Sequence, residues 1–419
     1  MNGHAVETAS HLIQNGVNAA KTLVHEPEMH DLDVSKLTVS LTKSPGKVPE
    51  PDSLEIWDMK TCTDHMVKVT WTDDVGWHAP TIEPYGQLTM SPIASCLHYA
   101  TQCFEGLKVY RGFDGKLRLF RPDKNCARLV MSSARVALPT FNPKELEKLL
   151  KAFMKVDGPK WLPKSRPGRF LYLRPAIIGN GEQIGVTAPS EVLMFIVAVG
   201  WPDLSSGTRP GTLPKPPGLK LLASKSDVRA WPGGFGYAKV GANYGPAFVS
   251  HMEGRKMGYD QILWLLGADY QVTEAGASNF FIVWKTKEGN LQLVTAPLDA
   301  KVILEGVTRG SVLELARQRL VSGSEYLPPN ITDLEVVERN FTMLEIEEAW
   351  EEGRIVEAFL SGTAYFITPV SAISFRDEEI DIPMGDGTSG YYAALLKKWL
   401  KDIMYGNVQH EWGVVIDEE

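Results

Sequence analysis

The sequence predicts an α+β protein with two domains, and three observations support this prediction. The chain has 419 residues, which is enough for two separate hydrophobic cores. Residues 201–218 contain five prolines and three glycines, too many for a helix or a strand, and they separate two regularly patterned halves. The second half consists mainly of successive strand patterns, which favours a mixed or antiparallel sheet. We therefore expect an N-terminal extension over residues 1–52, a smaller α/β domain over 53–200, an interdomain loop over 201–218 and a larger domain over 219–419.

Composition and charge exclude several classes of protein. A net charge of -8 leaves no excess of positive charge to neutralise a nucleic-acid backbone, and no apolar run approaches the roughly 20 residues of a membrane span. The four cysteines form no CxxC pair, so we expect reduced thiols and no metal site. The first 35 residues carry five acidic residues and no arginine. This pattern argues against a mitochondrial presequence and favours a cytoplasmic protein whose N-terminal extension is partly ordered.

The first half is predicted to combine strands with two helices. Apolar patterning bounded by turn residues indicates strands over 66–71, 108–110, 116–120, 170–175 and 191–200. Pro122 suits the first turn of a helix that runs to about residue 136, and an amphipathic helix follows over 143–156. The segment 179–185 looks like a dinucleotide-binding loop, but its glycine spacing is one residue too long and Pro189 interrupts any following helix.

The second half is predicted to be a run of strands with three helices among them. The helices are expected over 246–256, 311–320 and 391–404. The strands are expected over 219–223, 261–266, 270–273, 279–284, 291–294, 355–360, 365–367 and 372–375, with a tight turn over 361–364.

Lys239 stands in a glycine-rich loop from Trp231 to Pro246, among five glycines and four aromatic residues. We expect glycine to permit the backbone geometry of this loop and small neighbours to leave room beside the amine. A solvated loop lysine is the ordinary interpretation of such a stretch. The alternative is a lysine that forms a Schiff base with pyridoxal phosphate, and this chemistry also needs a phosphate site and a carboxylate for the pyridine nitrogen.

Other parts of the chain offer candidates for these groups. Glu274 follows a strand, where its carboxylate is either a partner for a protonated pyridine nitrogen or a solvated acid. The segment 306–308 precedes a helix, and the free N–H groups of a helix start attract anions, although most bind only water. Tyr244 is either a hydrogen-bond donor to the phenolate oxygen of the ring or a packed side chain.

Arg128 is the candidate side chain for the phosphate, but its own segment argues against that role. Its neighbours at helical spacing, Lys124 and Ser132, are polar, so the segment by itself favours a solvated surface charge.

Tyr172 and Arg174 are two residues apart in a strand and therefore point to the same face. They form either a structural stack or the lining of a polar pocket.

Six segments of the chain carry distinctive motifs. They are LHYATQCFEGLKVYRG from Leu97, FLYLRPAIIG from Phe170, VRAWPGGFGYAKVGANYGP from Val228, QVTEAGASNFF from Gln271, LEGVTRGSV from Leu304 and SGTA from Ser361. Together they resemble motifs of the branched-chain amino acid aminotransferases, which are pyridoxal-phosphate enzymes of fold type IV. The resemblance runs in order from about Ser53 to the Glu411-Trp412 end and so covers most of the chain.

The resemblance implies a homodimeric transaminase of fold type IV that exchanges the amino group of Leu, Ile or Val with 2-oxoglutarate. It implies that Lys239 is the Schiff-base lysine and proton carrier, with Glu274 facing the pyridine nitrogen and Tyr244 the phenolate oxygen. The other cofactor-binding residues that it implies are Arg128, Leu304, Val307 and Thr308. The implied substrate-binding residues are Tyr99, Thr363 and Ala364 for the substrate carboxylate and Phe104, Tyr172 and Arg174 for the side-chain pocket.

The sequence departs from the family pattern at four places. Ala277 replaces a threonine after the glutamate, Glu305 replaces a proline before the phosphate helix, and residues 365–368 lack the CxxC that some animal members carry. The loop that begins at Trp201 is also longer than is usual in the family. The differences at Ala277 and Trp201 leave open a fold type IV aminotransferase for a specialised substrate of secondary metabolism, a D-amino acid or an amine. A cofactor-binding protein without turnover is the alternative from a different class.

Overall fold

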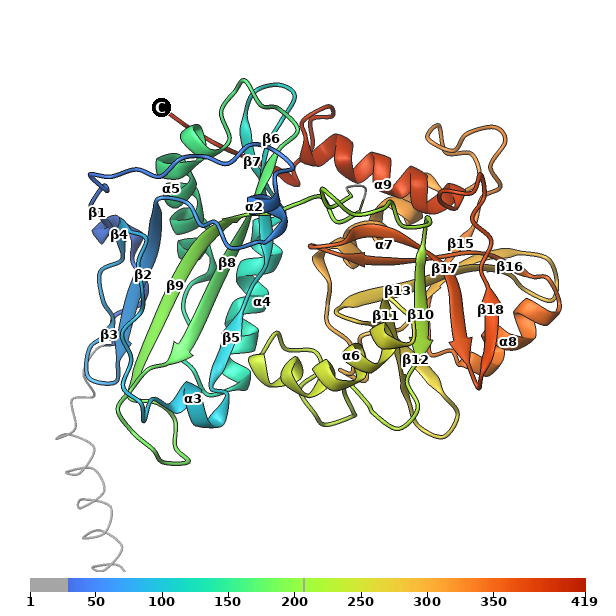
Figure 1. The fold of residues 1–419 in the computed structure, drawn as a ribbon, viewed down its shortest axis with the longest axis horizontal. Helices are drawn as coiled ribbons and strands as arrows, with labels where there is room; N and C mark the ends of the chain where they lie inside the picture. The colour runs from blue at the N-terminus through green and yellow to red at the C-terminus, as the bar shows by residue number, and fades with distance from the viewer. Residues whose placement is uncertain (1–28, 206–207) are drawn as a thin grey trace, which may run out of the picture.

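The computed structural model describes residues 29–205 and 208–419, so most of the predicted N-terminal extension lies outside the described residues. The strands form two sheets that lie side by side, one built mainly from the first half of the chain and one from the second (Figure 1). Helices pack against both sheets. The α+β class predicted from the sequence is confirmed.

The first sheet is mainly antiparallel, and within the described residues it has ten strands. Its main path follows the order β1-β4-β2-β9-β8-β6-β7-β19, in which only the pair β1–β4 is parallel. The strands are β1 (Thr38–Val39), β2 (His65–Thr72), β3 (Gly76–Trp77), β4 (Thr81–Pro84), β5 (Gln102–Phe104), β6 (Leu107–Arg111), β7 (Leu117–Phe120), β8 (Phe170–Gly179), β9 (Glu191–Gly200) and β19 (Gly413–Ile416). The α-helices of this half are α2 (Leu54–Trp57), α3 (Ser95–Tyr99), α4 (Pro122–Arg135) and α5 (Pro143–Trp161).

The second sheet is mixed, as the sequence predicts. Its main path follows the order β12-β11-β10-β17-β16-β13-β14-β15, and β10 runs parallel to both of its neighbours. The strands are β10 (Leu219–Ala223), β11 (Gln261–Leu266), β12 (Gln271–Ala275), β13 (Ser278–Lys285), β14 (Leu291–Thr295), β15 (Glu335–Glu338), β16 (Ile355–Gly362), β17 (Phe366–Phe375) and β18 (Glu378–Asp381). The helices are α6 (Phe248–Lys256), α7 (Val307–Arg319), α8 (Met343–Glu351) and α9 (Tyr391–Met404).

Among the described residues, three apolar cores hold these layers together. The first joins β-strands of the first sheet to α4 and α5, and the second lies within the second sheet and under α8. The third packs α7 and α9 against the second sheet and also includes Tyr110 and Phe120 of the first sheet. In this third core the rings of Phe281 and Phe359, on neighbouring strands, stack with centroids 5.0 Å apart. The two sheets therefore share buried apolar contacts through α7 and α9.

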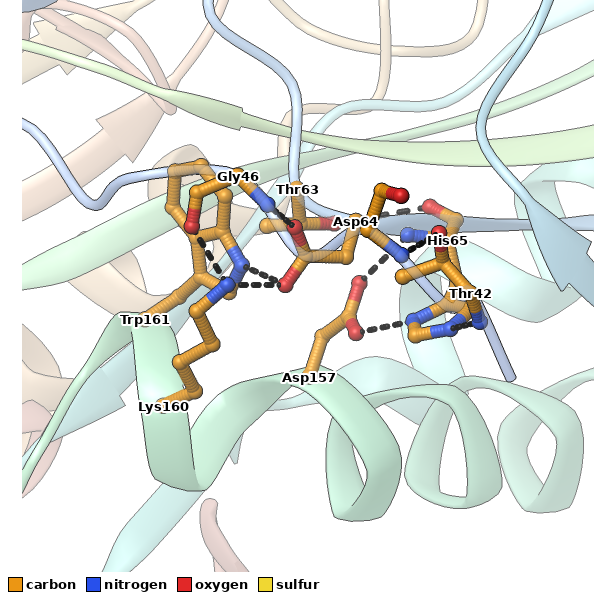
Figure 2. Close-up of polar contacts among 9 residues, drawn as sticks. Thr42, Gly46, Thr63, Asp64, His65, Asp157, Lys160 and Trp161 are labelled. Atoms are coloured by element: carbon orange, nitrogen blue, oxygen red, sulfur yellow. Dashed lines mark hydrogen bonds and ion pairs between the residues drawn. The ribbon is translucent and has the colours of Figure 1, made fainter.

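The segment before β2 is tied to α5 by a buried histidine (Figure 2). His65 Nε2 accepts a hydrogen bond from the backbone N–H of Thr42 at 2.9 Å, so the ring carries its proton on Nδ1. That nitrogen donates to Asp157 Oδ1 at 2.6 Å, while Oδ2 accepts from the His65 backbone at 3.0 Å. Beside this pair, Asp64 accepts from Lys160 Nζ at 2.6 Å and from Gly46 N at 2.6 Å. These contacts fix residues 42–46 on the end of α5.

Several elements differ from the sequence-based predictions. Helix α5 continues to Trp161 instead of ending near residue 156, and it includes Pro159, which lacks a backbone N–H donor, close to its C-terminal end. The strands predicted over 365–367 and 372–375 form one continuous strand, β17. The short strand β19 pairs antiparallel with β7 and so returns the end of the chain to the first sheet. The division of the chain at residues 201–218 stays a prediction.

All four cysteines are free thiols, and two of them, Cys103 and Cys126, are buried. Burial raises the pKa of Cys103 to about 12.

Within the part of the chain that the structure describes, no helix is both long and apolar enough to cross a membrane.

Candidate active site

Lys239 lies in the loop between β10 and α6, and its backbone is bound to the first half of the chain. Its N–H donates to Ser132 Oγ on α4 at 2.8 Å, and its carbonyl accepts from the N–H of Phe104 at 3.1 Å. The side-chain amine donates to Tyr244 Oη at 3.0 Å and lies 5.0 Å from the centre of the Phe104 ring. The backbone contacts fix the lysine, and its amine points to a phenol.

Gly236 of this loop is required by close packing. We predicted that the loop glycines permit an unusual backbone geometry, but among the five only Gly233 has a positive φ. A Cβ on Gly236 would lie 2.4 Å from Ala230 Cβ and 2.8 Å from the carbonyl oxygen of Val302. The loop therefore passes so close to neighbouring backbone that a larger residue would displace it.

Arg128 is buried, with 8% of its surface exposed, so the interpretation of its segment as a solvated surface charge is wrong. Its Nε donates to Glu105 Oε1 at 2.6 Å and its Nη2 to Glu105 Oε2 at 2.9 Å. Burial works against both charges, but the ion pair raises the pKa of Arg128 and lowers that of Glu105, so both stay charged. Asn125 also donates to Glu105 Oε2, at 2.8 Å.

Glu274, on β12, is a buried carboxylate with one oxygen well bound and one not. Its Oε1 accepts from Asn279 Nδ2 at 3.1 Å and from the backbone N–H of Leu304 at 3.2 Å. Its Oε2 lies 2.7 Å from Arg229 Nη1, an ion pair without hydrogen-bond geometry, and this oxygen has no hydrogen-bond partner among the described residues. Burial raises the pKa of Glu274, and the positive charge of Arg229 opposes that shift.

The start of α7 forms a place for an anion. The helix begins at Val307, four residues earlier than predicted, so Val307 and Thr308 lie in its first turn. Gly306 precedes the helix and provides no side-chain cap for its N–H groups. Arg128 Nη1 donates to the carbonyl of Glu305 at 2.7 Å, which brings the guanidinium to the helix start. A positive side chain and uncapped N–H groups suit a bound phosphate.

Aromatic and cationic side chains continue from Lys239 along β8. The rings of Phe104 and Tyr244 have centroids 5.1 Å apart, and Arg174 Cζ lies 4.7 Å from the centre of the Phe104 ring. Arg174 also lies 5.4 Å from the ring of Tyr172, which stacks on Trp201 with centroids 4.5 Å apart. The structure thus brings together the three residues predicted to line the side-chain pocket.

The residues predicted to bind the substrate carboxylate lie in two separate elements, a turn of the second sheet and a short helix of the first half. Thr363 and Ala364 lie in the turn between β16 and β17, and the Ala364 carbonyl accepts from Lys108 Nζ at 3.4 Å. Tyr99 ends α3 and is 41% exposed. No hydrogen bond or ring contact within the described residues joins Tyr99 to Lys239.

Comparison with known proteins identifies the family. The model of the family described as amino-transferase class IV matches residues 102–373. The chain belongs to this family. It is 40% identical over 385 residues to a branched-chain-amino-acid aminotransferase of Monosiga brevicollis, covering 92% of this chain and 93% of the relative. It is 39% identical over 392 residues to the cytosolic branched-chain-amino-acid aminotransferase of Saccharomyces cerevisiae, covering 92% and 98%.

Solved structures of branched-chain aminotransferases share the fold of this class IV aminotransferase. The enzyme of Thermoproteus uzoniensis with norvaline has a TM-score of 0.63 at 22% identity, covering 83% of this chain and 99% of that one. The enzyme of Thermobaculum terrenum in its PLP-bound holo form has a TM-score of 0.61 at 23% identity, covering 83% and 98%. The expected fold type IV architecture is confirmed.

The residues of this class IV aminotransferase fit pyridoxal phosphate, the cofactor of the family. Glu274 Oε2 is a buried oxygen that pairs with the charge of Arg229 but accepts no hydrogen bond among the described residues, so it is able to accept one from a pyridine N–H. The uncapped start of α7 beside Arg128 suits the phosphate, and the amine of Lys239 suits the aldehyde.

Sequence reasoning missed several residues that hold the predicted ones in place. Glu105 and Arg229 lie within motifs that were noticed, but neither had a partner in its own segment. Ser132 was considered only as a polar neighbour of Arg128, whereas it binds the backbone of Lys239. The signal that could have found Glu105 and Arg229 is a charged residue that stands inside a motif and has no partner of opposite charge in the same segment.

Proposed function

We propose that the protein is a pyridoxal-phosphate-dependent transaminase that moves the amino group of Leu, Ile or Val to 2-oxoglutarate, giving branched 2-oxo acids and glutamate. The observation that carries the proposal is the position of the Lys239 amine, 3.0 Å from the phenol of Tyr244 and over the face of Phe104. Relatives that are about 40% identical over nine-tenths of the chain and are named branched-chain-amino-acid aminotransferases support the substrate class.

The residues of the site then have distinct tasks. When bound, pyridoxal phosphate withdraws electrons from the α carbon of the amino acid and so loosens its proton. Lys239 Nζ would take that proton from the α carbon and return it to the cofactor carbon bonded to the same nitrogen, with Tyr244 orienting the amine. Glu274 would face the pyridine nitrogen, and Arg128, which reaches the start of α7, would hold the phosphate together with the uncapped first turn of that helix. Leu304, whose N–H donates to Glu274, would lie against the ring.

The pocket must accept both a branched side chain and the γ-carboxylate of glutamate. Phe104 and Tyr172 offer apolar faces to the branched chain. Arg174 has a buried Nε without a hydrogen-bond partner among the described residues, which makes it our candidate for the γ-carboxylate. Tyr99 and the turn of Thr363 and Ala364 are assigned to the α-carboxylate. The two amino acids therefore react in turn at one site.

We further propose a homodimer. Apolar side chains on α3 and α6 are exposed, and a second copy of the chain would remove them from water. They are Leu97, Tyr99, Phe248, Val249 and Met252, with between 41% and 62% of each exposed. A dimer that covers α3 would also enclose Tyr99, which suits its assigned role. Equilibrium sedimentation of the wild-type protein tests this part of the proposal.

The function is tested by a substrate panel and one variant. Purified protein with added cofactor should form glutamate from 2-oxoglutarate with Leu, Ile and Val, and Lys239→Ala should lose both turnover and the visible absorbance of bound cofactor. An active, yellow Lys239→Ala protein would overturn the assignment. Relatives include cytosolic and mitochondrial forms, so the cytoplasmic location stays a prediction for cell fractionation to check.

One observation favours a second candidate substrate class. Trp201 stacks on Tyr172 and so places a bulky ring behind the side-chain pocket. An aminotransferase for a specialised amino acid, a D-amino acid or an amine is therefore the second candidate. Higher kcat/KM with D-alanine, aromatic acids or amines than with Leu, Ile and Val would decide for it.

A further inference from the structure

Lys108 is a buried cation that the proposed reaction leaves without a task. It lies on β6 with only 6% of its surface exposed, although lysine is rarely buried unless it is paired. Its amine lies 4.2 Å from the centre of the Phe170 ring and donates one long hydrogen bond, 3.4 Å, to the carbonyl of Ala364. An ammonium group has three donors, so this environment is sparse for a buried charge.

The partner of Lys108 is the turn that the proposed function assigns to the substrate carboxylate. Gly362 of β16 pairs with Phe366 of β17, and the turn comprises residues 363–365 between them. Thr368 Oγ1 donates to the carbonyl of Tyr365 at 2.7 Å, so a side chain of the same hairpin holds one turn carbonyl. Lys108 holds the adjacent one, Ala364, from the other sheet. Two neighbouring carbonyls of the turn are thus bound from two sides.

The charges around Lys108 come from the interdomain loop and from α9. Asp203 of the loop attracts the ammonium group and Lys401 of α9 repels it, while these two side chains pair with each other at 3.6 Å. Lys397 of α9 donates to the carbonyl of Ser205 at 3.2 Å and so holds the same loop. Tyr172 is opposite Lys108 in the neighbouring strand. Burial lowers the pKa of Lys108 to about 8, so its charge is present below that pH and is lost above it.

We propose that Lys108 is a positioning residue for the α-carboxylate of the substrate, because its ammonium group holds the Ala364 carbonyl and places a positive charge beside the turn that receives the carboxylate. The inference rests on the proposed function, which assigns this turn to the carboxylate. A buried positive charge attracts a carboxylate more strongly than a solvated positive charge does. Lys108 therefore selects acids over uncharged substrates of the same shape.

The test compares binding of an acid with binding of its amide. The probes are 4-methylvalerate and 4-methylvaleramide, which lack an amino group and cannot react. Calorimetric titration of cofactor-loaded wild type, Lys108→Met and Lys108→Arg is carried out from pH 6.5 to 9.5. In wild type, acid binding should weaken about tenfold between pH 7 and pH 9, as the charged fraction falls.

The two variants separate charge from packing. Methionine keeps the length of the side chain without the charge, so Lys108→Met should bind the acid at least tenfold more weakly than wild type at pH 7. Its affinity for the acid should not fall further as the pH rises through 8. Its affinity for the amide should stay within twofold of wild type. Lys108→Arg should retain acid binding at pH 9. Equal weakening of acid and amide in Lys108→Met, or an unchanged pH dependence, would overturn the inference. Failure of the proposed function would appear instead as wild-type protein that forms no glutamate from leucine.

Discussion

Arg128 holds Glu105 with two parallel hydrogen bonds, of 2.6 and 2.9 Å, in a part of the molecule where 1% of the Glu105 side chain reaches solvent. The same guanidinium reaches the start of α7 through the carbonyl of Glu305. Glu105 therefore fixes the direction of the arginine that we assign to the cofactor phosphate. A planar, two-pronged contact leaves the guanidinium little freedom to turn.

Replacing Glu105 by glutamine should destabilise the protein. The amide keeps the shape of the side chain but removes the charge, and Arg128 is left as a buried cation without its partner. We expect the free energy of unfolding to fall by about 3 kcal/mol, measured by urea denaturation of cofactor-loaded protein. Glu50→Gln is the control, because Glu50 pairs with Arg166 at the surface and should contribute less than about 1 kcal/mol. Equal losses in the two variants would contradict the prediction.

Glu274→Gln should affect turnover more than cofactor binding. A neutral amide cannot hold the proton on the pyridine nitrogen, whereas the phosphate contacts of Arg128 and α7 remain. We expect kcat to fall at least about a hundredfold, the usual cost of removing a preorganised charge from a reacting group. Glutamate formation gives kcat, and absorbance of the dialysed protein gives the retained cofactor. Glu288→Gln, at an exposed turn, is the control. A kcat within threefold of wild type would exclude the assigned role of Glu274.

The sequence singled out Lys239, Tyr244 and Glu274 as candidates, and the resemblance to a family gave each its predicted role. These roles stay predictions. The sequence did not predict the burial of Arg128, because the partner that makes burial possible lies 23 residues away in another element. Lys124 and Ser132 suggested a solvated face, yet Ser132 is fully buried against the lysine loop. The pairing of β19 with β7 was missed for the same reason, since contacts between distant segments leave no mark on local patterning.

Glu357 should make the stability of the protein depend on pH near neutrality. This carboxylate on β16 is buried and accepts hydrogen bonds from the N–H groups of Tyr392 at 3.0 Å and Ala393 at 2.7 Å, at the start of α9. Burial raises its pKa from 4.5 to about 7, so the folded state binds the proton more tightly than the unfolded state. This group therefore destabilises the fold at pH 8, and the destabilisation falls steadily as the pH drops below 7 and disappears only below the unfolded value of 4.5.

The measurement is the free energy of unfolding at pH 8 and pH 5.5 for wild type and Glu357→Gln. Glutamine removes the titration and keeps one acceptor for the helix N–H groups. Relative to the variant, wild type should gain about 2 kcal/mol between pH 8 and pH 5.5. A difference between the two proteins that stays constant over this range would show that Glu357 does not titrate there.

The last strand should depend on an ion pair beyond its end. Arg111 is fully buried and binds the carbonyls of Leu162 and Gly115, each at 2.6 Å. Its two terminal nitrogens donate to Glu418 at 2.7 and 2.8 Å, two residues after β19. Glu418→Ala leaves the guanidinium without a counter-charge, so we expect a loss of about 3 kcal/mol in the free energy of unfolding at pH 7. Glu411→Ala, which removes a carboxylate from the exposed surface near the same strand, should cost far less.

The pH dependence of this effect follows from the direction of the shift. The hydrogen bonds from Arg111 lower the pKa of Glu418, so its stabilisation is present above the ordinary value of 4.5 and is lost as the pH falls through the lower, folded value. Wild type and Glu418→Ala should therefore converge in stability in acid and differ most at neutral pH. Because β19 pairs with β7 of the first sheet, hydrogen exchange of the β19 amides should accelerate in the variant at neutral pH. Unchanged exchange of the β19 amides in the variant would show that the backbone hydrogen bonds to β7 are enough to hold the strand.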